Sequence, residues 1–481
     1  MTSKNLKTKA AHLFLGVTAA SILISCSWLF PEEKLQVSID DYAATHPISK
    51  VKLNAQKFDM YVDFSDGIVY AYDDELTSKH MLNLVNKVLQ SSNMDKAFGM
   101  GQNTITDISG LSSTQFYNKV IDKKNYVDIM APIEQTLKSI TNGNNLAILV
   151  TDFEEYTQDR RVQHQAYAAD YFNAWLDKGG NIVFYVFPYK EKNIDKHLYL
   201  TIFDNSTNSL DKEVQESFEG LNHNYTRFNL GNTFYSISKS YLANTKGGCN
   251  HDPEKMDDII SYTNEDGKPD SWHVISGQAA EYYPFGEGWT EIYNSVKATI
   301  AEYKETPKNE RQKLIDYKFL IGNLTIDFSD LHSYNVEELE AVVYNIQDDI
   351  DAYNQYVNDS TNYDPEETDE NGKRLPKPVY KSVDYTKVPD MLVFNGSIEN
   401  NKANISIDFS PKFTGVLPSA LQEAETIAVD IVISKCQLNY SKINSLFFWG
   451  NNNSLEQSVR LTMQKFKPEG KVLYRYYIKN I

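Results

Sequence analysis

The chain has 481 residues and a formal net charge of −18 at pH 7, with 41% hydrophobic and 12% aromatic residues. A chain this long is too large for a single hydrophobic core, so we expect at least two domains. Its apolar content excludes global disorder. So acidic a surface repels phosphate backbones, which excludes a nucleic-acid-binding function.

The N-terminal segment predicts a signal for export. Lysines at 4, 7 and 9 precede an apolar run from Leu13 to Ile24, shorter than the about 20 residues of a membrane-spanning helix. The string from Leu23 to Cys26 resembles the lipobox of bacterial lipoproteins. This resemblance implies a signal peptide over 1–25 and lipid at Cys26, anchored to the outer membrane on its periplasmic or surface side. The alternative is a short uncleaved anchor.

A change of pattern marks the first folded domain. Residues 26–56 contain Pro31 and Pro47 and have no clear period, which indicates a tether. Residues 57–235 alternate apolar strand-like runs with helix-like segments, so we predict an α/β domain with a mainly parallel sheet. The expected strands are 58–65, 145–153, 181–188, 197–204 and 224–231, and the expected helices are 77–90, 128–140, 162–178 and 210–221.

The middle of the chain is harder to interpret. Residues 236–310 contain the string YYPFGEGW, and we predict an irregular insertion or linker there. Exposed aromatic side chains stack on sugar rings, so Tyr283 and Trp289 are candidate glycan contacts. Clusters of this kind also occur as small cores under long loops.

Residues 311–481 predict a β-rich, sandwich-like C-terminal domain with one long helix. The helix is expected over 336–357, where apolar residues recur at helical spacing, and a polar loop is expected over 358–391. The expected strands include 317–328, the string TIAVDIVISKCQL and the string SVRLTMQKF. Within the polar loop, the triplet Asp359-Ser360-Thr361 resembles the O-glycosylation acceptor of Bacteroidetes envelope proteins.

Two aspartates follow predicted buried strands, in the strings YVDFSDG and ILVTDFEE. In an open α/β sheet, ligands bind at the carboxyl ends of the strands, so Asp63 and Asp152 are expected to share a crevice if their strands are neighbours. The pair resembles the von Willebrand factor A (vWA) family, in which a DxSxS string and a later TD aspartate hold a divalent cation. The resemblance matches Asp63, Ser65 and Asp152 to the cation ligands and implies Mg²⁺ or Ca²⁺ as the cofactor.

Two positions depart from the family pattern. Gly67 stands where the family has a second serine, and Tyr126 or Val127 stands where an intervening loop supplies a threonine. Asp66 or Asp128 would then have to compensate. The sequence therefore leaves two alternatives, an occupied cation site and a degenerate, metal-free vWA-like scaffold.

These features predict a lipid-anchored envelope protein that binds and does not catalyse. The resemblance implies that the crevice, with Asp66 beside it, engages an acidic group of a protein partner. The alternative is a surface glycan-binding lipoprotein. A minor alternative is a phosphatase-like hydrolase, since DFSDG resembles the haloacid dehalogenase-type motif, but Ser65 replaces its second acid. The sequence leaves open whether Cys249 and Cys436 form a disulfide.

Overall fold

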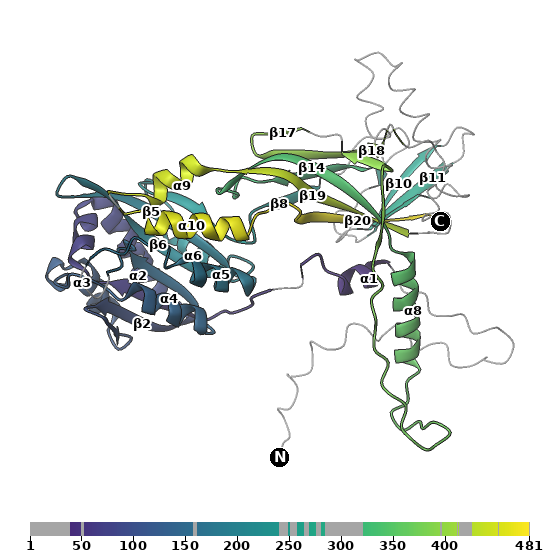
Figure 1. Cartoon of the computed structure of the whole chain (residues 1–481), viewed down its shortest axis with the longest axis horizontal. Helices are drawn as coiled ribbons and strands as arrows, with labels where there is room; N and C mark the ends of the chain where they lie inside the picture. The colour runs from purple at the N-terminus through teal and green to yellow at the C-terminus, as the bar shows by residue number, and fades with distance from the viewer. Residues whose placement is uncertain are drawn as a thin grey trace, which may run out of the picture.

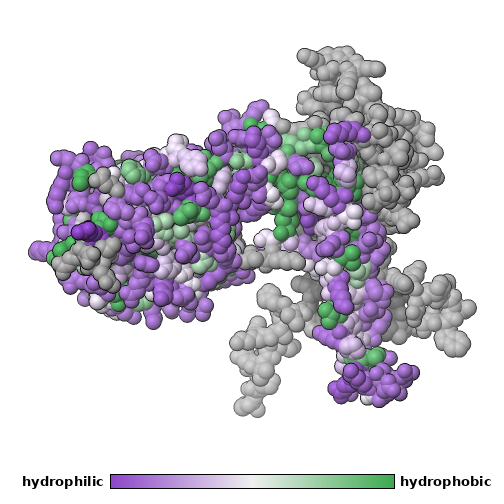
Figure 2. All heavy atoms as spheres, in the orientation of Figure 1, coloured by the Kyte–Doolittle hydropathy of each residue, from purple (hydrophilic) through white to green (hydrophobic). Residues whose placement is uncertain are grey.

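The computed structural model consists of an α/β unit and a β-rich unit joined by long strands (Figure 1). Hydrophilic residues cover most of the visible face of the α/β unit (Figure 2). The structure describes residues 39–49, 52–156, 161–239, 249–250, 257–263, 269–275, 280–283, 321–394, 397–410, 412, 426–450 and 452–480.

The α/β unit is built on a seven-stranded sheet with the order β3-β2-β1-β4-β6-β5-β7. Its strands are β1 (Phe58–Asp63), β2 (Met94–Gly101), β3 (Thr104–Asp107), β4 (Leu146–Thr151), β5 (Asn181–Glu191), β6 (Ile194–Asp204) and β7 (Thr226–Asn229). All five strands predicted in this region are confirmed.

The prediction of a mainly parallel sheet is wrong. Only β1 pairs in parallel, with β2 on one side and β4 on the other, and the remaining pairs are antiparallel. The reason is a tight hairpin between β5 and β6, in which Lys192 and Asn193 both adopt positive φ angles. A two-residue turn of this kind joins antiparallel strands directly and leaves no room for a crossover helix.

Helices surround this sheet, and their ends follow local capping rules. Asp74 caps α2 by accepting a hydrogen bond from the Thr77 amide, and Ser112 and Gln115 form a capping box at the start of α3. Helix α2 contacts α3 and α6, whereas α5 contacts α4. The elements are η1 (Asp66–Asp73), α2 (Glu75–Gln90), α3 (Ser113–Ile121), η2 (Lys123–Asn125), α4 (Ile133–Asn142), α5 (Ala169–Asp177) and α6 (Ser209–Ser217).

The β-rich unit contains two further sheets. The eight-stranded sheet has the order β15 (Thr386–Val388), β14 (Tyr334–Asn345), β19 (Thr426–Leu438), β20 (Val472–Asn480), β12 (Ala280–Tyr283), β11 (Pro269–Ile275), β10 (Asp257–Thr263) and β9 (Cys249–Asn250). The five-stranded sheet contains β16 (Leu392–Phe394), β18 (Lys402–Phe409), β13 (Ile321–Asp327) and β8 (Ser236–Lys239), with β17 (Ile398–Glu399) paired to β18. Strands β8 to β12 come from the segment that we expected to be irregular.

Two predicted elements in the C-terminal half are wrong. Residues 334–345 form strand β14, and helix α8 covers only Gln347–Thr361. The apolar residues Leu339, Ala341 and Val343 also alternate with period two, and pairing along the length of β19 favours the strand. Conversely, the expected strand at 458–466 belongs to helix α10 (Ser454–Lys465), because Leu455, Val459 and Met463 form one buried helical face.

Helices α9 (Tyr440–Phe447) and α10 connect β19 to β20 but pack on the α/β unit. The Phe447 ring is fully buried, and its centroid lies 5.1 Å from that of Phe184 and 5.0 Å from that of Phe228. The Tyr199 hydroxyl donates a hydrogen bond to the Leu446 carbonyl at 2.8 Å. The C-terminal region therefore completes the hydrophobic core of the N-terminal one.

Part of the segment that we expected to be a tether is packed. Helix α1 (Ile39–Thr45) buries Tyr42, whose ring lies against Tyr353 and Tyr477 of the β-rich unit. The Tyr42 hydroxyl donates a hydrogen bond to Asp349, which also accepts one from the Tyr380 hydroxyl at 2.6 Å. The chain just before the α/β unit is thus held by the β-rich unit.

Candidate functional site

The centre of the sheet brings the two predicted aspartates to one edge. Strands β1 and β4 are parallel neighbours with Val62 opposite Val150, so Asp63 and Asp152 follow at the same end of the sheet. Strand β2 lies on the other side of β1. The chain therefore adds β2 and β3 on one side of β1 and β4 on the other, so the strand order reverses at β1. Such switch points open a crevice beyond the carboxyl ends of the strands.

Asp63 lies beneath this crevice and has no exposed surface. One carboxylate oxygen accepts a hydrogen bond from the Ser65 amide at 2.8 Å, and the other accepts one from the Thr151 hydroxyl at 2.7 Å. Burial raises the pKa of Asp63 above its ordinary value, although these hydrogen bonds act in the opposite direction. Asp63 therefore orders the loops after both strands.

Asp152 begins a sharp bend. The next residue, Phe153, has a φ of 58°, which a bulky residue adopts at a cost of about 1–3 kcal/mol. Its fully buried ring packs on Phe172 and Tyr199, which holds the bend in place. The Glu154 amide then donates a hydrogen bond to Asp152 Oδ1 at 3.0 Å. Asp152 and Asp63 thus each accept a hydrogen bond from the amide two residues later in the chain.

Glu154 and Glu155 point apart, as adjacent acids on a loop usually do. Glu154 Oε2 lies 2.7 Å from Lys196 Nζ. Glu155 instead accepts a hydrogen bond from the Glu134 amide in the first turn of α4, at 2.7 Å. Burial raises the pKa of Glu155 to about 7. Glu155 therefore caps a helix, and only Glu154 faces the crevice.

Lys196, at the start of β6, is surrounded by carboxylates. Its ammonium lies 2.7 Å from Glu154, 2.7 Å from Glu191 and 3.9 Å from Asp152, and its side chain is only 7% exposed. Burial alone would lower the pKa of Lys196, but the charges of Asp152 and Glu154 raise it, so the side chain stays protonated. Burial and the Glu154 charge also raise the pKa of Asp152.

The opposite wall of the site comes from the far end of the sequence. Trp449 lies between α9 and α10, and the Lys196 ammonium is 4.9 Å from the centre of its ring. The crevice has a volume of about 770 Å³. Its lining includes Ser65, Asp66, Gly67, Ile129, Asp152, Glu154, Tyr156, Arg161, His164, Glu191, Ile194, Lys196 and Trp449.

The loop before α4 lies beside the crevice but supplies no threonine. Tyr126 is buried and donates its hydroxyl hydrogen bond to the Val120 carbonyl, and Val127 is 71% exposed. Asp128 forms a backbone bridge with Ser65, and its carbonyl accepts a hydrogen bond from the Asp66 amide at 2.7 Å. This loop therefore fixes the position of the loop after β1 through its backbone.

The oxygen atoms of Asp63 and Asp152 are the ligands expected for the predicted cation. Both oxygens of Asp63 and one oxygen of Asp152 already accept hydrogen bonds, and the other oxygen of Asp152 faces Lys196. Within the described part of the chain, no three histidine, cysteine, aspartate or glutamate side chains are arranged to hold a metal ion. The carboxylates of Asp63 and Asp152 therefore already have partners within the protein, and binding of Mg²⁺ or Ca²⁺ by Asp63, Ser65 and Asp152 stays a prediction.

Sequence reasoning found the aspartates but missed Lys196, Glu191 and Trp449. One available signal was a lysine beside an otherwise apolar strand, because a charge near a buried run needs a partner. Nothing in the sequence connects Trp449 to this edge of the sheet. Of the other predicted site residues, Tyr283 ends β12, and Cys26 and Trp289 lie outside the described residues.

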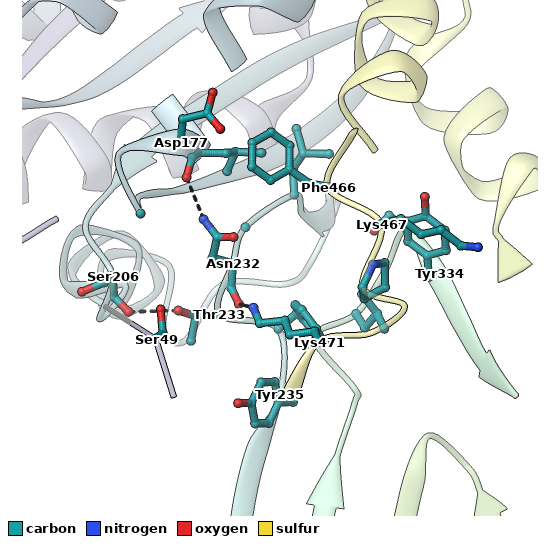
Figure 3. A pocket seen from close by; sticks show the side chains of 18 of the residues that line it. Ser49, Asp177, Ser206, Asn232, Thr233, Tyr235, Tyr334, Phe466, Lys467 and Lys471 are labelled. Carbon is teal, nitrogen blue, oxygen red and sulfur yellow. Dashed lines mark hydrogen bonds between the residues drawn. The ribbon is translucent and has the colours of Figure 1, made fainter. Parts of the chain in front are cut away.

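A second cavity, of about 990 Å³, lies where the α10–β20 loop meets the loop after β7 (Figure 3). Lys471 points into it, donates a hydrogen bond to the Asn232 carbonyl at 2.6 Å, and lies 4.6 Å from the centre of the Phe234 ring. Burial lowers the pKa of Lys471 to about 8. This cavity is far richer in lysine than the crevice at β1 and β4, and it contains neither predicted aspartate.

The fold and the site define an α/β protein with a carboxylate-lined crevice, completed by helices that a β-rich unit supplies. Comparison of the chain with models of protein families, with curated proteins and with solved structures finds no match. Among the described residues, no helix is long and apolar enough to cross a membrane. Cys436 is a free thiol and is buried.

Proposed function

We propose that this protein is a lipid-anchored binding protein of a bacterial cell envelope, and that a vWA-like α/β unit captures a protein partner at the crevice. The lipobox-like string ending at Cys26 supports the anchor and a location at the outer membrane. The parallel strands β2, β1 and β4, with Asp63 and Asp152 beyond their carboxyl ends, support the vWA-like character.

The observation that carries the proposal is the apolar rim of a polar crevice. Ile129 and Ile194 both line the opening, and they remain 54% and 49% exposed. Exposed apolar side chains around a polar depression are typical of protein-binding surfaces, where the rim is covered when the partner docks. A small hydrophilic ligand would leave both isoleucines in water.

The charges of the lining favour a basic group of the partner over the acidic group that the family resemblance implies. Among the described residues around the cavity, carboxylates outnumber cations, and the buried cation Lys196 already contacts three of them. A lysine or arginine side chain of the partner would reduce this excess of negative charge. The charged lining residues are Asp66, Asp152, Glu154, Glu191, Arg161 and Lys196.

Binding also accounts for Asp63 better than catalysis does. A phosphatase-like reaction would need this carboxylate as a nucleophile in contact with substrate. Asp63 is instead fully buried, its two oxygens accept hydrogen bonds, and it does not line the crevice. A structural role that shapes the crevice fits all three observations.

Site-specific photo-crosslinking tests the proposal. A photo-reactive amino acid replaces Ile129 or Ile194, and Leu461 of α10 provides a matched control because its exposure, 47%, is nearly the same. We expect both crevice positions to crosslink one protein in intact cells, and Leu461 to give no such product. Ile194→Lys, which removes the apolar contact and repels a basic group of the partner, should reduce the yield from Ile129 at least fivefold.

Two results would count against a binding crevice. Equal crosslinking from Leu461 would mean that the surface is contacted non-specifically. Complete absence of a product from both crevice positions in cells would mean that no protein docks there. A Leu461→Lys variant, which adds the same charge outside the crevice, should leave the yield from Ile129 unchanged.

A further inference from the structure

Lys196 lies where the loop after β1, the loop after β4 and the end of β5 meet. A Cβ atom placed on Gly67 would be 3.4 Å from Lys196 Nζ and 3.5 Å from both Asp152 Oδ2 and Glu191 Oε2. Residue 67 is the position at which the family motif has its second serine. A side chain at this position would therefore touch the lysine ammonium directly.

The surroundings of this ammonium are those of a bound cation. Two carboxylate oxygens lie at hydrogen-bond distance, a third carboxylate lies at 3.9 Å, and the face of Trp449 closes a further side. Charge-assisted hydrogen bonds of this length are strong when both groups are shielded from water. The ammonium therefore supplies the positive charge that the carboxylates of Glu154 and Glu191 require, and it also faces the carboxyl group of Asp152.

A divalent cation at the same place would meet the ammonium as a like charge within a few ångströms. The two carboxylate oxygens at 2.7 Å already bind the ammonium, so a metal ion at the same place would have to displace it. We infer that Lys196 is the resident cation of this site and takes the place of Mg²⁺ or Ca²⁺, so that partner capture needs no metal. The last step rests on the proposed function, whereas the assignment of Lys196 does not.

Metal titration of a lysine variant tests the inference. Lys196→Met keeps an apolar stem against Trp449 and removes the charge. We expect the wild-type protein to bind neither Ca²⁺ nor Mg²⁺ at 1:1 stoichiometry in calorimetry, and Lys196→Met to bind one Ca²⁺ with a Kd at least tenfold below the weakest that the titration detects. Adding Asp152→Asn should abolish the gain. Lys465→Met is the control, because this exposed lysine pairs with the single carboxylate of Asp177.

The variant loses the partner of buried carboxylates and is expected to be less stable. The double variant Lys196→Met,Glu191→Gln removes one negative charge along with the positive one, and each variant is also refolded with and without Ca²⁺. Folding only with Ca²⁺ supports the inference. Ca²⁺ binding by the wild type that Asp152→Asn abolishes would overturn it, and so would lysine variants that gain no Ca²⁺ affinity or fold under neither condition.

The crosslinking assay separates this inference from the proposed function. With both correct, the yield from Ile194 is the same with and without a chelator. A missing crosslink together with Ca²⁺ gain in Lys196→Met would refute partner binding and leave Lys196 as the resident cation. A crosslink that the chelator abolishes would leave the binding function standing and refute the role of Lys196.

Discussion

Phe447 is the side chain that most directly ties the C-terminal helices to the α/β unit. Its ring is fully buried and has neighbours on three sides, with centroid distances of 5.0 Å to Phe228, 5.1 Å to Phe184 and 5.8 Å to Tyr199. Truncating a fully buried phenylalanine to alanine removes transfer free energy and leaves a cavity, at a cost of about 3–5 kcal/mol. We expect Phe447→Ala to lower the free energy of unfolding by this amount.

Urea unfolding followed by fluorescence measures this change, and hydrogen exchange locates it. Because Phe447 belongs to the core of the α/β unit, amides of β5 and β6 should lose protection together with those of α9. Leu461→Ala, on the exposed face of α10, should change stability by less than about 0.5 kcal/mol. A loss below about 1 kcal/mol in Phe447→Ala, or a loss of protection confined to α9, would refute a shared core.

Three further changes probe buried polar groups. His332 accepts a hydrogen bond from a backbone amide, and burial lowers its pKa to about 4. The neutral imidazole therefore contributes stability that is present above pH 6.5 and is lost as the pH falls towards 4. The free energy of unfolding should drop by about 2–3 kcal/mol between pH 7 and 4.5, and by less in His332→Gln. Lys471 has no carboxylate within ion-pair distance among the described residues, and burial lowers its pKa to about 8, so Lys471→Met should raise the free energy of unfolding at pH 7 by about 1–2 kcal/mol in urea unfolding, with the gain fading as the pH rises from about 8 towards 10.5. Asp349→Ala should release the helix at Ile39–Thr45, seen as faster hydrogen exchange there, whereas unchanged exchange would mean that apolar packing alone holds the helix.

The sequence predicted the parts of the fold that local pattern determines. Continuous apolar runs identify β4, β5 and β6, because a strand buried on both faces needs apolar side chains at successive positions. The hairpin turn at Lys192 and Asn193 was missed because it lacks glycine, and with it the antiparallel half of the sheet. The segment of β14 was predicted as a helix and that of α10 as a strand. Each sequence fits a helical and a strand period equally well, and pairing of β14 with β19 and docking of α10 determine which one forms.

The site was predicted to the extent that it depends on two adjacent strands. Asp63 and Asp152 follow the strands that the apolar runs identify, so their shared edge follows from the parallel pairing of β1 and β4. Lys196 reaches the same edge only because β6 runs antiparallel to β4. Trp449 arrives from a helical connection between two strands of another sheet, and no local pattern contains that information.

The origin of the crevice in distant parts of the chain has a consequence for biosynthesis. Strands β1 to β7 leave the ribosome, and afterwards any export channel, well before residues 440–465 are available to cover them. During that interval the aromatic surface around Phe184 and Phe228 is open to chaperones and proteases, as it is for any partly synthesised core. A product truncated in this interval also lacks Trp449 and therefore one wall of the crevice. The same helices thus cover the open core and complete the crevice in a single step.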